Sequence, residues 1–260
     1  MTDMGGVLHM RYATELSWPQ IQSLDREKTS IIMPIASIEQ HGLHLPVGTD
    51  YLLMQKIAEQ LRDFHVEGYE GIILPTLQFG LNIEHCAFAG TITLKERCIE
   101  DILTQQADAF ARNGFLNFIV LNSHGGNSGL IDSFIRTYRA ATGCRMTTID
   151  YFRGKPFAGH EALFDNPVGL DVHAGEFETS LMMHLYPDLV DMKRDKADLA
   201  ECNLPARQLP FGWLTHEISK SGVIGDATYA SEEKGRAYYA IIMQYVQRAL
   251  KEFCGTLSKV

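Results

Sequence analysis

Apolar and polar residues follow one another in blocks that predict strands and helices in turn. Four short apolar runs rich in β-branched residues, each bounded by turn-forming or polar residues, predict buried strands at 30–36, 71–77, 115–122 and 145–150. Nearly continuous apolar runs of this kind are typical of parallel strands that are covered on both faces. We therefore expect a mainly parallel central sheet.

Between these runs, apolar residues recur every three to four positions, as they do on one face of a helix. This spacing predicts helices at 50–63, 94–112, 128–141 and 176–186, and a last helix that begins near Ser231. Residues 187–228 show no such period and are expected to be mostly irregular. The alternation of strand and helix predicts the α/β class. We expect a single-domain three-layer α/β/α sandwich that spans residues 1–260.

The overall composition argues against several classes of partner. The 260 residues carry a formal net charge of −9, and neither nucleic acid nor an anionic membrane surface attracts such a chain. The five cysteines are scattered and form no C-x-x-C pair, so no disulfide framework is indicated. No apolar run has the length of a membrane span or of a signal-peptide core. We expect a cytoplasmic protein.

Residues that can bind a metal follow two of the predicted strands. Glu39, His41 and Asp50 come after the first strand in "EQHGLHLPVGTD", and His124 follows the third in "NSHGGN". In open parallel sheets, ligands bind beyond the carboxyl ends of the strands, so these groups are expected at one rim. Carboxylates and imidazoles without thiolates suit divalent ions such as Zn²⁺, Mn²⁺ or Fe²⁺.

The number of candidate ligands favours two metal ions over one. If Asp50 bridged two ions, these four residues and one more glutamate would give each ion three ligands, and a hydroxide shared by the ions would attack an amide carbon. Taken singly, the residues have ordinary explanations, such as a solvated acid, a buried histidine or a helix N-cap at Asp50. Their joint occurrence at consecutive strand ends favours the metal site. His44 is expected either behind the ligands or in solvent.

A third polar cluster opens the predicted helix at 176–186. His173, Glu176 and Glu178 stand before or within its first turn, and the later residues of the helix are apolar. A carboxylate near a helix N-terminus gains about 0.3–1 kcal/mol from the helix dipole, which accounts for one of the two acids. The histidine and the second acid favour a place in the same site.

Four segments together resemble the creatininase (creatinine amidohydrolase) family. They are, in the order of the family, "EQHGLHLPVGTD", "NSHGGN", "HAGEFETSLM" and "SGVIGDATYASEEKG". The resemblance implies a homohexameric hydrolase that cleaves a C–N amide bond at a binuclear metal site, with a metal-bridging hydroxide as nucleophile. It implies that Glu39, Asp50 and His124 hold one ion, that His41 and Asp50 hold the other, and that His173 is the general acid and base.

One departure from the family pattern indicates a member other than creatininase proper. Gly126 stands where creatininase proper has a glutamate that completes the second metal site. We expect Glu176 to replace that ligand. Glu178 is then expected to act at the same site by orienting a ligand or His173.

A second departure predicts a substrate other than creatinine. The tryptophans that hold creatinine in creatininase proper have no counterpart, because Trp18 and Trp213 lie outside the corresponding stretches. We expect His85 to bind a different small-molecule amide. The backbone N–H groups of Gly125 and Gly126 are expected to hold an anionic part of it, since glycine allows close approach.

Two rival functions remain open from the sequence. A binuclear phosphoesterase would use the same types of ligand together with a cationic clamp. Arg153 and Lys155 offer such charges, although charges in surface loops are usually solvated. A non-catalytic scaffold would hold the metals for structure alone, but structural zinc sites usually contain cysteine and this set of ligands has none.

Overall fold

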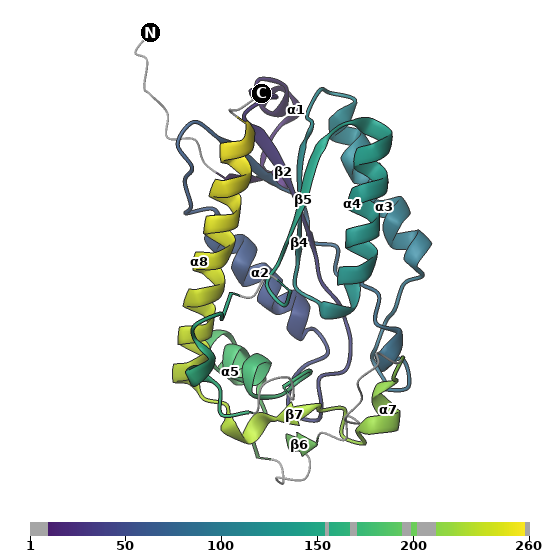
Figure 1. Cartoon of the computed structure of the whole chain (residues 1–260), viewed down its shortest axis with the longest axis vertical. Helices are drawn as coiled ribbons and strands as arrows, with labels where there is room; N and C mark the ends of the chain where they lie inside the picture. Colours follow the sequence, from purple (N-terminus) through teal and green to yellow (C-terminus); the bar gives the residue numbers. More distant parts are fainter. Residues whose placement is uncertain (1–9, 154–155, 167–170, 194–198, 202–211, 258–260) are drawn as a thin grey trace.

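The centre of the computed structural model is a five-stranded parallel sheet of order β1-β3-β2-β4-β5 (Figure 1). The structure describes residues 10–153, 156–166, 171–193, 199–201 and 212–257. All neighbouring strands pair in parallel, which confirms the predicted sheet. The strands are β1 (Met10–Tyr12), β2 (Thr29–Ile35), β3 (Glu70–Ile73), β4 (Asn117–Asn122) and β5 (Arg145–Asp150).

Helices cover both faces of this sheet. On one side lie α3 (Glu96–Ala111) and α4 (Ser128–Thr142), and on the other lie α2 (Thr49–Leu61), α5 (Glu176–Leu185) and α8 (Glu232–Leu257) (Figure 1). Short elements complete the described chain, namely α1 (Trp18–Gln22), α7 (Thr215–Ile218) and the antiparallel pair β6 (Ala200–Glu201) and β7 (Gly225–Asp226). Every helix in the described ranges is too short or too polar to cross a bilayer.

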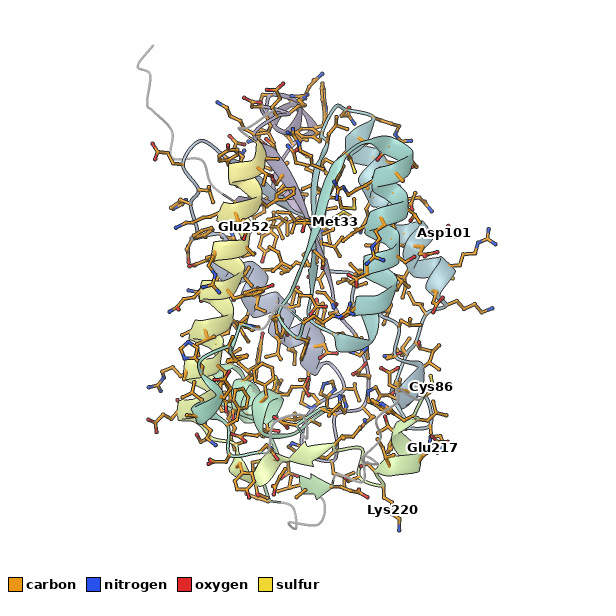
Figure 2. The ribbon with its side chains drawn as sticks, viewed as in Figure 1. Met33, Cys86, Asp101, Glu217, Lys220 and Glu252 are labelled. Carbon is orange, nitrogen blue, oxygen red and sulfur yellow. The ribbon has the colours of Figure 1, made fainter. Side chains whose placement is uncertain are left out.

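Two apolar cores, one on each face of the sheet, hold the layers together. Successive strand residues point to opposite faces. In β2, Ile31 and Met33 therefore pack with α3 and α4, whereas Ile32 packs with α2 and α8. Met33 lies in the middle of the molecule, and Asp101 of α3 points outward (Figure 2). The two cores confirm the predicted three-layer α/β/α sandwich, while its extent over all of residues 1–260 stays a prediction.

The predicted elements differ from the structure mainly at their ends. The strand predicted at 71–77 stops at Ile73, and Leu77 returns to the sheet only through an isolated bridge to Ile35. β1 and α1 were not predicted, because three to five residues are too few to show a period. Residues 187–228 hold only short elements where they are described, as expected, and 194–198 and 202–211 lie outside the described residues.

The sheet carries three polar segments to one end of the molecule. Because the strands are parallel, the residues that follow β2, β3 and β4 all leave from the same rim. These segments contain Glu39 and His41, the short helix η2 (Ile83–His85), and His124 with the short helix η3 (Gly125–Asn127). α5 lies at the same end (Figure 1).

Candidate metal centre

Five of the predicted site residues converge in one buried cluster. Glu39 and His41 lie in the loop after β2, Asp50 in the first turn of α2, His124 after β4, and Glu178 in the first turn of α5. None of the five is more than 6% exposed. Charged side chains are rarely buried so completely unless they are paired or bind a metal.

The carboxylates and imidazoles of the cluster face one another at the spacing of metal ligands. The two oxygens of Asp50 lie 3.4 Å from His41 Nε2 and 3.2 Å from His124 Nδ1. Glu178 Oε1 lies 3.7 Å from His41 Nε2. His124 Nε2 lies 3.3 Å from Glu39 Oε2 but donates to the carbonyl oxygen of Leu81 at 3.0 Å, so Nδ1 is the nitrogen of His124 that is left to bind a metal. Donor atoms about 2.1 Å from a shared tetrahedral ion lie about 3.4 Å from each other. Asp50 therefore stands between two imidazoles.

Two buried atoms at the centre of the cluster have no hydrogen-bond partner among the described residues. They are His41 Nε2 and Asp50 Oδ2. The other ring nitrogen of His41 lies 3.1 Å from the carbonyl oxygen of Glu39, to which it donates. In the neutral ring the lone pair is then on Nε2, and metal-binding histidines commonly donate from their second nitrogen in this way. The residues present thus fit a divalent metal ion.

Three sets of three side chains have ligand spacing. In each set, one donor atom of every residue lies within 4.8 Å of the others. Asp50 belongs to one of these sets and His41 to another, and the 3.4 Å contact between Asp50 Oδ1 and His41 Nε2 joins the two sets into one continuous cluster. The sets are Glu39, Asp50 and His124; His41, His173 and Glu178; and Glu39, His85 and His173.

The charges of the cluster shift the pKa values of its members in opposite directions. Burial lowers the pKa of His41 and His124, but Asp50, Glu178 and Glu39 outweigh it and hold both pKa values well above the ordinary value. Burial raises the pKa of Asp50, but His41 and His124 outweigh it and hold that pKa below its ordinary value. The cluster therefore stabilises positive charge at its centre, as a metal site does.

Two further predicted histidines lie against the cluster and against each other. The ring of His173 lies 4.3 Å from that of His41 and 4.1 Å from that of His85, measured between centroids. Burial, and then neighbouring imidazoles, lower the pKa of His85 and of His173. Both rings are therefore neutral near pH 7. His173 Nδ1 lies 3.7 Å from Glu39 Oε1, at the edge of the cluster.

Glu176, which the sequence suggested as a metal ligand, lies outside this cluster. Its carboxylate accepts hydrogen bonds from Tyr238 Oη at 3.0 Å, from Lys234 Nζ at 2.5 Å, and from two backbone N–H groups before α5. Residues two apart on a helix point about 200° away from each other, so only one of the two glutamates can face the cluster. That residue is Glu178, which had been expected only to orient a ligand or His173.

The two glycines after His124 have different surroundings. A Cβ atom at Gly126 would lie 2.4 Å from His124 Nε2 and 2.4 Å from the carbonyl oxygen of Leu81, so close packing explains this glycine. A Cβ atom at Gly125 would meet none of the described atoms within 4 Å. Gly125 is exposed, which accounts for the open space beside it, and the expected substrate contacts of both glycines stay predictions.

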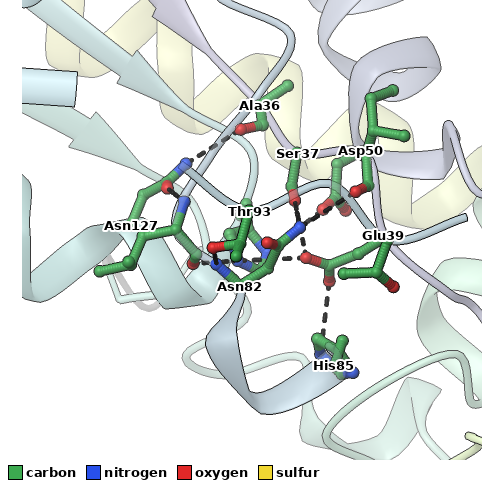
Figure 3. Close-up of polar contacts among 12 residues, drawn as sticks. Ala36, Ser37, Glu39, Asp50, Asn82, His85, Thr93 and Asn127 are labelled. Carbon is green, nitrogen blue, oxygen red and sulfur yellow. Dashed lines mark hydrogen bonds and ion pairs between the residues drawn. The ribbon is translucent and has the colours of Figure 1, made fainter. Parts of the chain in front are cut away.

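Sequence reasoning missed the polar residues that hold the ligands in place. Ser37 donates to Glu39 Oε2 at 2.7 Å, and Asn82 donates to Ser37 Oγ at 2.6 Å (Figure 3). His44 is buried, and its Nε2 lies 2.8 Å from Thr179 Oγ1, so it lies behind the ligands rather than in solvent. Hydroxyl and amide side chains are common in loops, and no spacing in the sequence distinguishes Ser37 and Asn82 from the others.

The chain is similar to named hydrolases over most of its length. It is 31% identical over 220 residues to the mycofactocin precursor peptide peptidase of Mycobacterium ulcerans (strain Agy99). The aligned part covers 81% of this chain and 80% of the peptidase. It is 26% identical over 259 residues to the creatinine amidohydrolase of Pseudomonas putida, with 93% and 96% covered.

Solved structures of creatininase have the same fold. One named "Creatininase Mn" and one mutant creatininase described as Zn-Zn type superpose with TM-scores of 0.73 and 0.72. Each is 25% identical to this chain, and each comparison covers 93% of this chain and 97% of the other. Metal ions of these two kinds are thus named for structures that share this fold.

The sequence model of the creatininase family, described as creatinine amidohydrolase, matches residues 14–250. This span contains every residue of the buried cluster. The chain is 26% identical to the Pseudomonas putida enzyme and 31% identical to the mycobacterial peptidase. These values agree with the prediction that the chain is a member of the family other than creatininase proper. The chain belongs to the creatininase family.

Proposed function

We propose that this protein is a metal-dependent hydrolase that cleaves a C–N bond in a small-molecule amide. The observation that carries the proposal is the buried convergence of three carboxylates and two imidazoles around two unsatisfied ligand atoms. Asp50 would be the ligand shared by two divalent ions, with Glu39 and His124 as further ligands of one ion and His41 and Glu178 of the other. Oxygen and nitrogen donors without sulfur suit zinc, manganese or iron.

The protein's own residues supply the proton transfers of the proposed reaction. Bound divalent ions would supply Lewis acidity, which makes water a better nucleophile and polarises the amide carbonyl. His173 donates its Nε2–H to the carbonyl oxygen of Gln40 at 2.6 Å, which leaves the lone pair of Nδ1 facing the cluster. In this tautomer Nδ1 accepts a proton from the attacking water and returns it to the leaving nitrogen.

Elemental analysis of the purified protein tests the metal centre. We expect about two ions per chain in the wild type and about one or fewer in His124→Ala, because His124 faces both Glu39 and Asp50. His65→Ala, at an exposed position, is the matched control and is expected to keep the wild-type content. An unchanged content in His124→Ala would contradict the proposal.

A cavity of about 370 Å³ lies beside the cluster and suggests the class of substrate. His173 and Glu178 belong both to its wall and to one of the sets with ligand spacing. Cavities of this size hold small molecules, and apolar walls select apolar groups. Much of the wall is formed by the aromatic side chains of Tyr151, Phe152, Phe157, Phe164 and Phe177.

The charges around the cavity favour a neutral substrate over a phosphoester. The described residues that line it include the acids Glu161 and Asp171, and none of them is a lysine or arginine. Arg153 is instead paired with Asp132 at 2.6 Å, and Lys155 lies outside the described residues. An amide with an uncharged apolar or aromatic group fits this lining, whereas the described residues of the wall offer no cationic clamp for a phosphoester.

Hydroxamic acids, which chelate divalent metals, test the cavity separately from the metals. We expect phenylacetohydroxamate to bind roughly tenfold or more tightly than acetohydroxamate, because burial of a phenyl group stabilises by about 1.5–3 kcal/mol. Ala158→Trp, at an exposed position in the cavity wall, is expected to remove this preference and keep acetohydroxamate binding. Ala140→Trp, exposed on α4, is the control. Equal wild-type affinities would contradict the aromatic substrate and leave the metal centre standing.

The non-catalytic scaffold has less support than the hydrolase. Structural zinc sites are closed and usually contain cysteine, and none of the cysteines in the described ranges belongs to a set with ligand spacing. The cluster also borders a cavity, as a catalytic site requires. The homohexamer implied by the resemblance and the cytoplasmic location expected from the sequence both stay predictions.

A further inference from the structure

We infer that Gln40 is a positioning residue that holds two neighbouring imidazoles in opposite tautomers, so that His85 is a hydrogen-bond donor and His173 an acceptor. The consequence for catalysis rests on the proposed hydrolase function.

Two backbone groups fix which way the side-chain amide of Gln40 points. Its Oε1 accepts a hydrogen bond from the N–H of Gly42 at 2.9 Å, and its Nε2 donates to the carbonyl oxygen of Gly222 at 3.1 Å. A backbone N–H can only donate and a backbone carbonyl can only accept, so the flipped amide would lose both bonds. The amide nitrogen is therefore the atom that meets His85.

This orientation of the amide determines the tautomer of His85. Gln40 Nε2 lies 2.8 Å from His85 Nδ1, and an amide nitrogen can only donate. Nδ1 must therefore carry the lone pair and Nε2 the proton. Thr215 Oγ1 also lies 2.8 Å from Nδ1 and can donate to it. His85 Nε2 lies 3.5 Å from Glu39 Oε1, so its N–H is directed at the cluster (Figure 3).

The backbone of the same glutamine sets the opposite tautomer in His173. His173 donates from Nε2 to the carbonyl oxygen of Gln40 at 2.6 Å, and its lone pair is left on Nδ1. Nδ1 lies 3.7 Å from Glu39 Oε1, the same oxygen that the N–H of His85 faces. Two rings 4.1 Å apart thus offer a donor and an acceptor on the same side of the cluster.

This arrangement removes His85 from the possible metal ligands. Glu39, His85 and His173 have ligand spacing, but a ring nitrogen that carries a proton cannot bind a metal. His85 instead directs its N–H at Oε1 of Glu39, while Ser37 donates to Oε2 at 2.7 Å. Donors on both oxygens orient this carboxylate, and loss of such a partner typically lowers metal affinity by about 10–100-fold.

The two residues whose backbone groups bind the Gln40 amide are both glycines, and Gly222 also makes room for it. Gly222 has a φ angle of +90°, and a Cβ atom there would lie 1.9 Å from Gln40 Oε1. Gly42 has a φ angle of +68°, in the left-handed region that glycine adopts without strain. The segment "SGV" (221–223) is thus required as a close neighbour of "EQHG" (39–42), although the two lie far apart in the sequence.

Nitrogen NMR of the full chain labelled with ¹⁵N-histidine tests the tautomers directly. Without metal, we expect a pyridine-type shift at Nδ1 of His85 and a pyrrole-type shift at Nε2, with assignment by loss of these signals in His85→Gln. With ¹¹³Cd²⁺ bound, we expect nitrogen–cadmium coupling at His41 and His124 and none at His85. Gln40→Glu presents a hydrogen-bond acceptor to Nδ1 of His85, so the signal of Nδ1 is expected to change from pyridine-type to pyrrole-type. Gln60→Glu, exposed on α2, is the control.

The outcomes separate this inference from the proposed function. A proton on Nδ1 of wild-type His85, a cadmium coupling at His85, or an unchanged tautomer in Gln40→Glu would each overturn the role of Gln40. A lack of cadmium coupling at every histidine would instead overturn the metal-dependent function, and the tautomers measured without metal would still decide the inference. Gln40→Glu is further expected to bind metal about 10–100-fold more weakly than Gln60→Glu.

Discussion

Replacement of Asp50 by asparagine is expected to reduce the metal content from about two ions per chain to one or none. The reason is that the two carboxylate oxygens face different imidazoles, at 3.4 Å from His41 and 3.2 Å from His124. An amide keeps one oxygen as a ligand, but its NH₂ group cannot replace the other. Hydrolysis of any amide that the wild type cleaves is expected to fall by about 10³-fold or more.

Elemental analysis and the rate of hydrolysis check this prediction together. Asp132→Asn is the matched control, because Asp132 lies at the surface in an ion pair with Arg153, and it is expected to keep both ions and full activity. Circular dichroism of Asp50→Asn would show whether the fold is retained. A folded Asp50→Asn protein that still holds two ions would show that Asp50 does not bridge them.

Most of the fold and the first part of the site could be predicted, because both depend on local patterns. The apolar run of β2 and the periodic stripes of α3 and α4 place the layers. Once the strands are parallel, the rule that ligands bind at their carboxyl ends brings Glu39 and His124 together. Part of the candidate metal site could therefore be predicted as residues that follow strands.

The remaining features depend on tertiary geometry that no local pattern contains. From the sequence, Asp50 could have been the N-cap of α2. In the structure Gly48 is the N-cap, so Asp50 lies in the first turn of the helix and its side chain faces the cluster. The start of α5 decides which of Glu176 and Glu178 faces the site, and a shift of one residue moves each by about 100°. The role of Gln40 requires Gly222, which is distant in the sequence.

Glu176 instead holds together the segment before α5 and the long helix α8. It is fully buried, and its carboxylate accepts hydrogen bonds from Lys234 and Tyr238 of α8. It also accepts from the backbone N–H groups of Asp165 and Asn166, at 3.0 Å and 2.7 Å. A carboxylate with several donors around it is hard to replace, because each donor would otherwise be left unsatisfied in the interior.

Glu176→Ala is expected to lower the free energy of unfolding by about 3–5 kcal/mol, since it leaves buried donors without their acceptor. For a domain of this size, that loss lowers the Tm by roughly 6–20 °C. Metal content should not change in Glu176→Ala, whereas Glu178→Ala is expected to lose metal, because Glu178 Oε1 lies 3.7 Å from His41 Nε2. Thermal unfolding and elemental analysis of the two variants, with exposed Glu233→Ala as control, measure both effects. Loss of metal with unchanged Tm in Glu176→Ala would make Glu176 the ligand, because removal of the carboxylate would then have left α5 and α8 as stable as before.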